Sequence, residues 1–199
     1  HRNTNDAMGL VQTTEGTVEK LSSLVIRLRE LSVQASNQTY TSDDRDTILE
    51  EMTAIYGDWR RVSSSAEYND IAVMTSNSTL SFQVGKDSGT GNTVSLDLSE
   101  FHIPSVSIFN VVGDTIKAGT SARSSIARRN LRALDSTLDI LGNMRATLGS
   151  TQNRLETALA QVGDENNTLQ AARSRIVDVN YASEAANMTR LQMQQQVGI

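Results

Sequence analysis

An apolar residue recurs at every seventh position in the last third of the chain, and this repeat limits the possible folds more than any other feature. Its members are Leu134, Leu141, Leu148, Leu155, Val162, Leu169 and Ile176. The partner column predicted beside it is mixed: Leu131, Leu138, Arg145, Gln152, Leu159, Asn166 and Arg173. A seven-residue apolar repeat is typical of a helix that packs lengthwise on other helices. We therefore predict a long helix over 122–180, with the row that begins at Leu134 mostly buried.

Two further helices are predicted in the first third of the chain. Apolar residues alternate at three-and-four spacing over 4–36, and a flanking row at Leu10, Leu24 and Leu31 indicates contact with more than one neighbour. The helical spacing resumes over 43–65, with Ser42 or Asp43 as the expected N-cap. Trp59 and Tyr56 lie on or beside the apolar row of this helix, so we interpret them as packing residues.

The middle of the chain has a different pattern. TLSFQV and TVSLDL alternate apolar and polar residues on either side of GKDSGTGN, which predicts a β-hairpin near 79–98. The glycine-rich loop lacks the order G-x-x-x-x-G-K-[ST] and precedes no helix, so nucleotide binding is not predicted there. The fold class is mainly α with a small β part: an elongated bundle of long antiparallel helices, a β-hairpin and a short variable region.

Composition excludes several functional classes. Eighteen lysines and arginines stand against 23 aspartates and glutamates, which is not the basic footprint of nucleic-acid binding. The chain has no cysteine and two histidines, His1 and His102, so neither a thiolate or histidine zinc site nor a Ser–His–Asp set is predicted. No apolar run reaches the length of a membrane span. We predict no enzymatic activity and no cofactor.

Three stretches resemble bacterial flagellin: NTNDAMGLVQTTEGTVEKL, RLRELSVQASN and AARSRIVDVNYASEAANMTRLQMQQQVG. The resemblance runs from about residue 2 to 73 and from about 131 to 198. It implies the core filament domain with both terminal segments truncated. On this basis residues 1–75 are the amino-terminal helices, 76–121 the hairpin and short variable region, and 122–199 the carboxy-terminal long helix of the same core domain.

The resemblance also implies a function and partners. The expected protein is a structural subunit of the bacterial flagellar filament, which self-assembles into a helical polymer for swimming motility. It would be extracellular, exported without a cleaved signal peptide, and would meet other flagellin subunits, an export chaperone and a cap protein. The alternatives are a flagellin-like cell-surface adhesin or polysaccharide-binding protein, and the hook–filament junction protein. The H-E-x-x-H motif of flagellins with a metalloprotease insert is absent.

The resemblance singles out Arg27, Leu31 and Glu51. The matching flagellin residues lie on an exposed helical face that packs against other subunits and is read by the Toll-like innate immune receptor for flagellin. The sequence departs from the receptor-recognised pattern at Ile26, where glutamine is common, and at residues 57–59. The alternative is that Arg27 and Glu30 form only a solvated pair within one helix. The three residues lie on two predicted helices, so they can meet only if those helices pack together.

Overall fold

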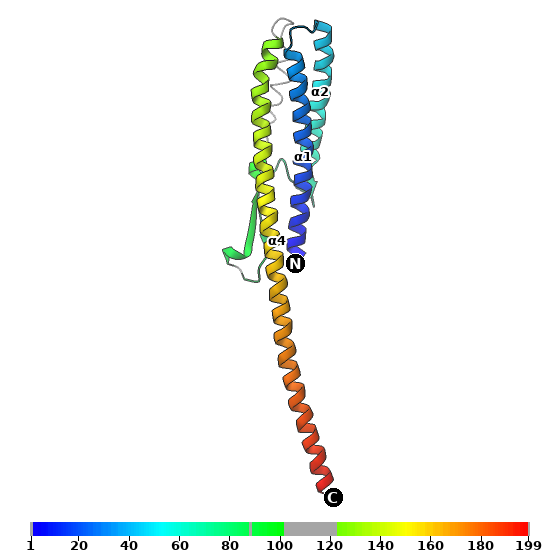
Figure 1. The fold of residues 1–199 in the computed structure, drawn as a ribbon, viewed down its shortest axis with the longest axis vertical. Helices are drawn as coiled ribbons and strands as arrows, with labels where there is room; N and C mark the ends of the chain where they lie inside the picture. The colour runs from blue at the N-terminus through cyan, green and yellow to red at the C-terminus, as the bar shows by residue number, and fades with distance from the viewer. Residues whose placement is uncertain (1, 88, 102–122, 199) are drawn as a thin grey trace.

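The computed structural model describes residues 2–87, 89–101 and 123–198, and three long helices dominate it. They are α1 (Arg2–Ser36), α2 (Ser42–Ser65) and α4 (Arg123–Val197). In Figure 1, α1 lies between α2 and α4, and both run antiparallel to it. The contacts of α1 with α2 and with α4 confirm the predicted elongated, mainly α architecture.

The core is a long seam between α1 and α4. On α1 the buried seam residues alternate at three-and-four spacing: Thr4, Ala7, Val11, Thr14, Val18, Leu21, Val25, Leu28, Ser32 and Ala35. On α4 the buried residues follow the same spacing: Ala127, Asn130, Leu134, Thr137, Leu141, Met144, Leu148, Thr151 and Leu155. This is the spacing at which two helices pack side chains into each other along their length.

The second column of the α4 seam differs from the predicted one. Leu131 and Leu138 are only half-buried, whereas Thr137 and Thr151 are buried. The hydroxyls of Thr137 and Thr151 donate to the carbonyls of Ala133 and Thr147, at 2.8 and 2.9 Å. Each hydroxyl is therefore satisfied within its own helix, and the residue fits the seam although it is polar.

The predicted apolar row is buried for only part of its length. Leu134, Leu141, Leu148 and Leu155 are buried, and Val162 is half-buried. Leu169 and Ile176 are 64% and 65% exposed. In Figure 1, α4 runs on past the N-terminal end of α1, and it ends at Val197 rather than near the predicted residue 180. The row loses its burial where α1 stops.

Helix α2 begins with a capping box, and its N-cap lies one or two residues before the predicted Ser42 or Asp43. Its N-cap is Thr41, whose hydroxyl accepts from the backbone N–H of Asp44, while the Asp44 carboxylate accepts from the backbone N–H of Thr41. Trp59 is 2% exposed and stacks on Tyr56 at 6.4 Å between ring centroids, which confirms both as packing residues.

The predicted hairpin is present as strands β3 (Thr79–Gln83) and β4 (Thr93–Asp97), which pair antiparallel with Phe82 opposite Val94. Short 3₁₀ helices, Thr90–Asn92 and Leu98–Phe101, flank β4. A second small hairpin was not predicted: β1 (Glu67–Tyr68) and β2 (Ile71–Ala72) are joined by Asn69 and Asp70, both at positive φ. Asn and Asp tolerate this conformation, so the YND turn was the available signal. Residues 102–122, most of the expected variable region, lie outside the described residues.

Candidate functional site

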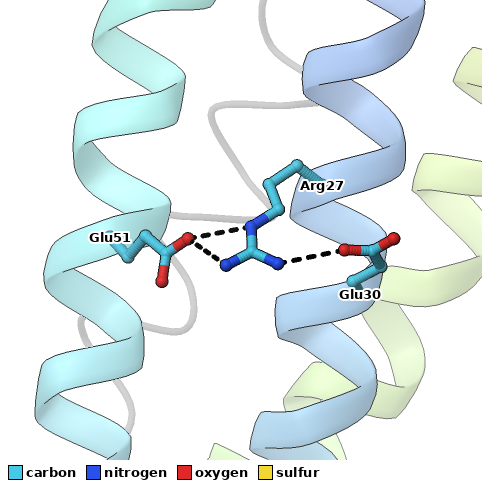
Figure 2. Close-up of polar contacts among 3 residues, drawn as sticks. All are labelled: Arg27, Glu30 and Glu51. Carbon is cyan, nitrogen blue, oxygen red and sulfur yellow. Dashed lines mark hydrogen bonds and ion pairs between the residues drawn. The ribbon is translucent and has the colours of Figure 1, made fainter.

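Arg27 joins α1 to α2 through Glu51 and also binds Glu30 of its own helix. Its Nε and Nη2 atoms donate to Glu51 Oε1 at 2.9 and 2.6 Å, and its Nη1 atom donates to Glu30 Oε2 at 3.1 Å. Figure 2 shows the guanidinium between the two carboxylates, one from each helix. Helices α1 and α2 therefore pack closely enough for Arg27 and Glu51 to meet. The pair between Arg27 and Glu30 within α1, which the alternative interpretation predicted, is present as well.

The cluster is charged and accessible. The side chains of Arg27, Glu30 and Glu51 are 46%, 57% and 45% exposed. The hydrogen bond to Glu51, and then that to Glu30, raise the pKa of the Arg27 guanidinium, so it stays protonated. Water screens such an exposed cluster, and its contribution to folding stability is small. The arrangement holds the charged groups in a defined geometry at the surface.

Leu31 is not part of this surface, and the expectation that it is exposed was wrong. Its side chain is 1% exposed. Leu31 belongs to the flanking apolar row with Leu10, which is also buried, and Leu24, which is half-buried. A large apolar side chain in that row is covered because α1 has helices on two sides.

Two apolar residues accompany the charged cluster; sequence reasoning named Ile26 only as a departure from the receptor-recognised pattern and missed Val33. Ile26 and Val33 on α1 are each 47% exposed. Ile26, Glu30 and Val33 are spaced four and three residues apart, so they lie on one face of the helix. We call Ile26, Arg27, Glu30, Val33 and Glu51 the α1 patch. Its mixture of exposed apolar groups and arginine is common in the contacts between proteins.

A second interhelical ion pair holds α1 against α4. Arg29 Nε donates to Asp135 Oδ1 at 2.6 Å, across 106 residues of sequence. Sequence reasoning missed this pair, because no local spacing relates residues so far apart. Together with Arg27–Glu51, it shows which levels of α2 and α4 lie beside this part of α1.

Groups typical of catalysis are scarce in the part of the chain that the structure describes. Residues 2–87, 89–101 and 123–198 contain no cluster of three or more histidine, cysteine, aspartate or glutamate side chains that could hold a metal ion. His1 and His102 lie outside these residues. No described helix is both long and apolar enough to cross a membrane.

Comparison with known families gives two matches, one at each end of the chain. Residues 1–79 match the bacterial flagellin N-terminal helical region, and residues 131–199 match the bacterial flagellin C-terminal helical region. Together the two matches include all of α1 and α2 and most of α4.

Individual relatives are flagellins. The flagellin of Halalkalibacterium halodurans is 31% identical over 156 residues, which are 78% of this chain and 54% of that flagellin. The flagellin of Salmonella choleraesuis is 31% identical over 140 residues, which are 68% of this chain and 28% of that protein. The chain thus spans little more than half the length of the first relative and less of the second.

Solved structures share the fold. Bacillus cereus flagellin superposes with a TM-score of 0.64 at 23% identity, covering 80% of this chain and 88% of that structure. Bacillus cereus FlgL superposes with the same TM-score at 16% identity, covering 84% of this chain and 90% of that one. At these identities the likeness concerns the fold alone.

Proposed function

The chain belongs to the bacterial flagellin family, and we propose that it is a structural subunit of the bacterial flagellar filament, self-assembling into a helical polymer for swimming motility. The observation that carries this proposal is the pair of family matches, one at each end of the chain. We assign it no enzymatic activity.

The exposed surface supports a protein that binds its neighbours. Large apolar side chains are exposed along the second half of α4, namely Leu169, Ile176, Val177, Tyr181, Met188, Leu191 and Met193. Exposed apolar side chains at helical spacing are suited to packing against further helical segments, from the same subunit or from a neighbour. A contact between two different faces of identical subunits does not have to close, and it then generates an open helical filament.

We propose that the subunit acts outside the cell, in the flagellum, and is exported without a cleaved signal peptide. Transport through a narrow channel would require an unfolded chain, and a chain without cysteine forms no disulfide that resists unfolding. A flagellar export chaperone and a cap protein are the proposed partners before and during assembly. We also propose the domain division given above, with both helical regions in one core domain.

The α1 patch is the proposed contact site for neighbouring subunits or for the Toll-like innate immune receptor. Arg27 and Glu51 offer it charged groups in a fixed arrangement, and Ile26 and Val33 add exposed apolar area. Leu31 supports the patch from below by packing, because its own side chain is buried.

The test is electron microscopy of the full-length protein after precipitant-induced assembly. Straight or supercoiled tubes are expected. Amorphous aggregates or persistent monomers under conditions that polymerise another flagellin would overturn the proposed function. No observation on the described residues favours the adhesin or junction-protein alternative. Binding of the purified chain to acidic polysaccharides would support the adhesin alternative.

A further inference from the structure

We propose that Met188 and Met193, on the second half of α4, are oxidation sites, and that their conversion to methionine sulfoxide by a peroxide prevents assembly of the subunit. The two sites follow from exposure and from the chemistry of sulfur. The effect on assembly rests on the proposed function. Both residues lie where α4 runs on past the N-terminal end of α1 (Figure 1).

The methionines of the chain fall into two groups that differ in their access to water. Four of them are buried or half-buried in the packed region: Met8, Met52, Met74 and Met144. Met188 and Met193 are instead 55% and 57% exposed, whereas Met144 is 3% exposed. All six methionines lie in the part of the chain that the structure describes, so the comparison includes every one. A dissolved oxidant therefore has ready access to two methionine side chains, and both are on the same half of α4.

No thiol competes with these two side chains for an oxidant, because the chain contains no cysteine. A peroxide oxidises a thioether in one two-electron step. The sulfur lone pair attacks one peroxide oxygen, the S–O bond forms as the O–O bond breaks, and the second oxygen of hydrogen peroxide leaves as water. The sulfur is oxidised to the sulfoxide and the peroxide is reduced. Hydrogen peroxide is therefore a sufficient reactant.

The sulfoxide changes the surface on which it forms. Met188 and Met193 are next to Leu191 in the sequence, which is 60% exposed and belongs to the exposed apolar side chains of α4. A thioether is apolar and adapts to the surface that it packs on, whereas a sulfoxide is polar. Packing that removes water from this part of α4 would leave the new oxygen without a hydrogen-bond donor, which is unfavourable.

Helix formation does not require methionine at either position. Leucine and methionine have similar helix propensities, and one often replaces the other at little cost in packing. Leucine and isoleucine already stand at the exposed positions Leu169, Ile176 and Leu191 of the same half. A leucine variant should therefore keep the helix and its apolar surface, while it cannot form a sulfoxide.

Peptide mass spectrometry tests the two sites in the full-length, unassembled protein treated with hydrogen peroxide. Met188 and Met193 should gain oxygen several times faster than Met52 and Met144, the buried controls, while circular dichroism shows that the protein stays folded. Equal rates at all four positions overturn the inference. Slow oxidation of Met188 and Met193 also overturns it, and would show that another segment of the full-length subunit covers them.

Assembly after oxidation tests the consequence. The peroxide-treated protein should lose assembly under conditions in which the untreated protein forms filaments, and treatment with methionine sulfoxide reductase should restore it. The double variant Met188→Leu/Met193→Leu should assemble both before and after peroxide. The matched control Met52→Leu/Met144→Leu keeps the exposed methionines, so it should assemble before peroxide and fail to assemble after it.

The outcomes separate this inference from the proposed function. Assembly of protein that carries a sulfoxide at both positions overturns the inference and leaves the proposed function intact. So does a loss of assembly that Met188→Leu/Met193→Leu shares, because the damage then lies elsewhere in the chain. Failure of the untreated protein to assemble overturns the proposed function and with it the effect on assembly, whereas mass spectrometry still decides the oxidation sites.

Discussion

The two halves of α4 carry the same apolar repeat but have opposite environments. From Leu134 to Leu155 the repeat is buried against α1, whereas Leu169 and Ile176 are mostly exposed. The helix itself continues unbroken to Val197. The repeat therefore specifies a helix and one apolar face, and the presence of a second helix decides whether that face forms a core.

The same contrast extends to polar residues. In the packed half, Thr137 and Thr151 enter the seam because each hydroxyl is bonded to its own helix. In the second half, Thr168 and Thr189 make the same type of bond to Asp164 and Ala185 and remain exposed. A threonine bonded in this way does not determine burial; the neighbouring helix does.

The largest expected effect separates the two halves directly. Leu141→Ala removes a side chain that is 1% exposed and should destabilise the fold by about 2–5 kcal/mol through lost burial and a cavity. Leu169→Ala removes a side chain that is 64% exposed and should change stability by less than about 0.5 kcal/mol. Urea unfolding followed by circular dichroism measures both. Equal losses would contradict the contrast between the halves.

Replacing glycines of α4 by alanine should have a smaller effect, which raises the free energy of unfolding instead of lowering it. Neither Gly142 nor Gly163 has an atom within 4 Å of an added Cβ, so alanine fits at both positions. Gly142→Ala in the packed half should raise the free energy of unfolding by about 0.5–1 kcal/mol. Gly163→Ala lies where the seam ends and should raise helicity locally, with a smaller shift of the urea midpoint. A larger midpoint shift for Gly163→Ala would argue that the seam extends further along α4.

Arg27 tests the surface rather than the core. Arg27→Ala removes the link to Glu51, but its exposed position predicts a nearly unchanged melting temperature. Assembly or receptor binding should be impaired. Leu31→Ala, four residues away and buried, is the matched contrast and should lower the melting temperature first. A large fall in melting temperature for Arg27→Ala, or unimpaired assembly and receptor binding, would remove the α1 patch as an interface.

The smallest expected effect is a change in how the free energy of unfolding depends on pH. Hydrogen bonds from the Thr41 side chain and backbone hold the pKa of the Asp44 carboxyl below its usual value of about 3.9, and those from Ser99 do the same for Asp97. Because the folded pKa is the lower one, this stabilisation is complete above the unfolded value and is lost as the pH falls through the folded value. Asp44→Asn should therefore lower the free energy of unfolding at pH 7. The variant should also lose less stability than the original chain when the pH falls below about 4. Urea midpoints at several pH values measure this slope, and an unchanged slope would contradict it.

The sequence predicted the elements that depend on local periodicity. The spacing of apolar residues in α1, α2 and the row from Leu134, and the alternation around Phe82 and Val94, correspond to helices and a hairpin in the structure. The flanking row with Leu24 and Leu31 correctly indicated that α1 has two neighbours.

Features that depend on a neighbour were not predictable in the same way. Leu31 was assigned to an exposed face by resemblance, but α1 is covered on two sides and its side chain is buried. The buried positions of Thr137 and Thr151 were missed because a hydropathy scale counts threonine as polar. It does not consider that each hydroxyl is hydrogen-bonded within its own helix. The pair Arg29–Asp135 depends on the register of two distant helices, which no local spacing specifies.

Amide hydrogen exchange of the 199-residue chain, resolved along α4, tests the central claim most directly. The claim is that α1 holds the first half of α4 and that the second half has no packing partner among the described residues. Amides around Leu134 to Leu155 should be protected almost to the level of global unfolding. Those from Leu169 onward should exchange faster by orders of magnitude, since only local helix opening protects them. Uniform protection along the whole helix would contradict the account.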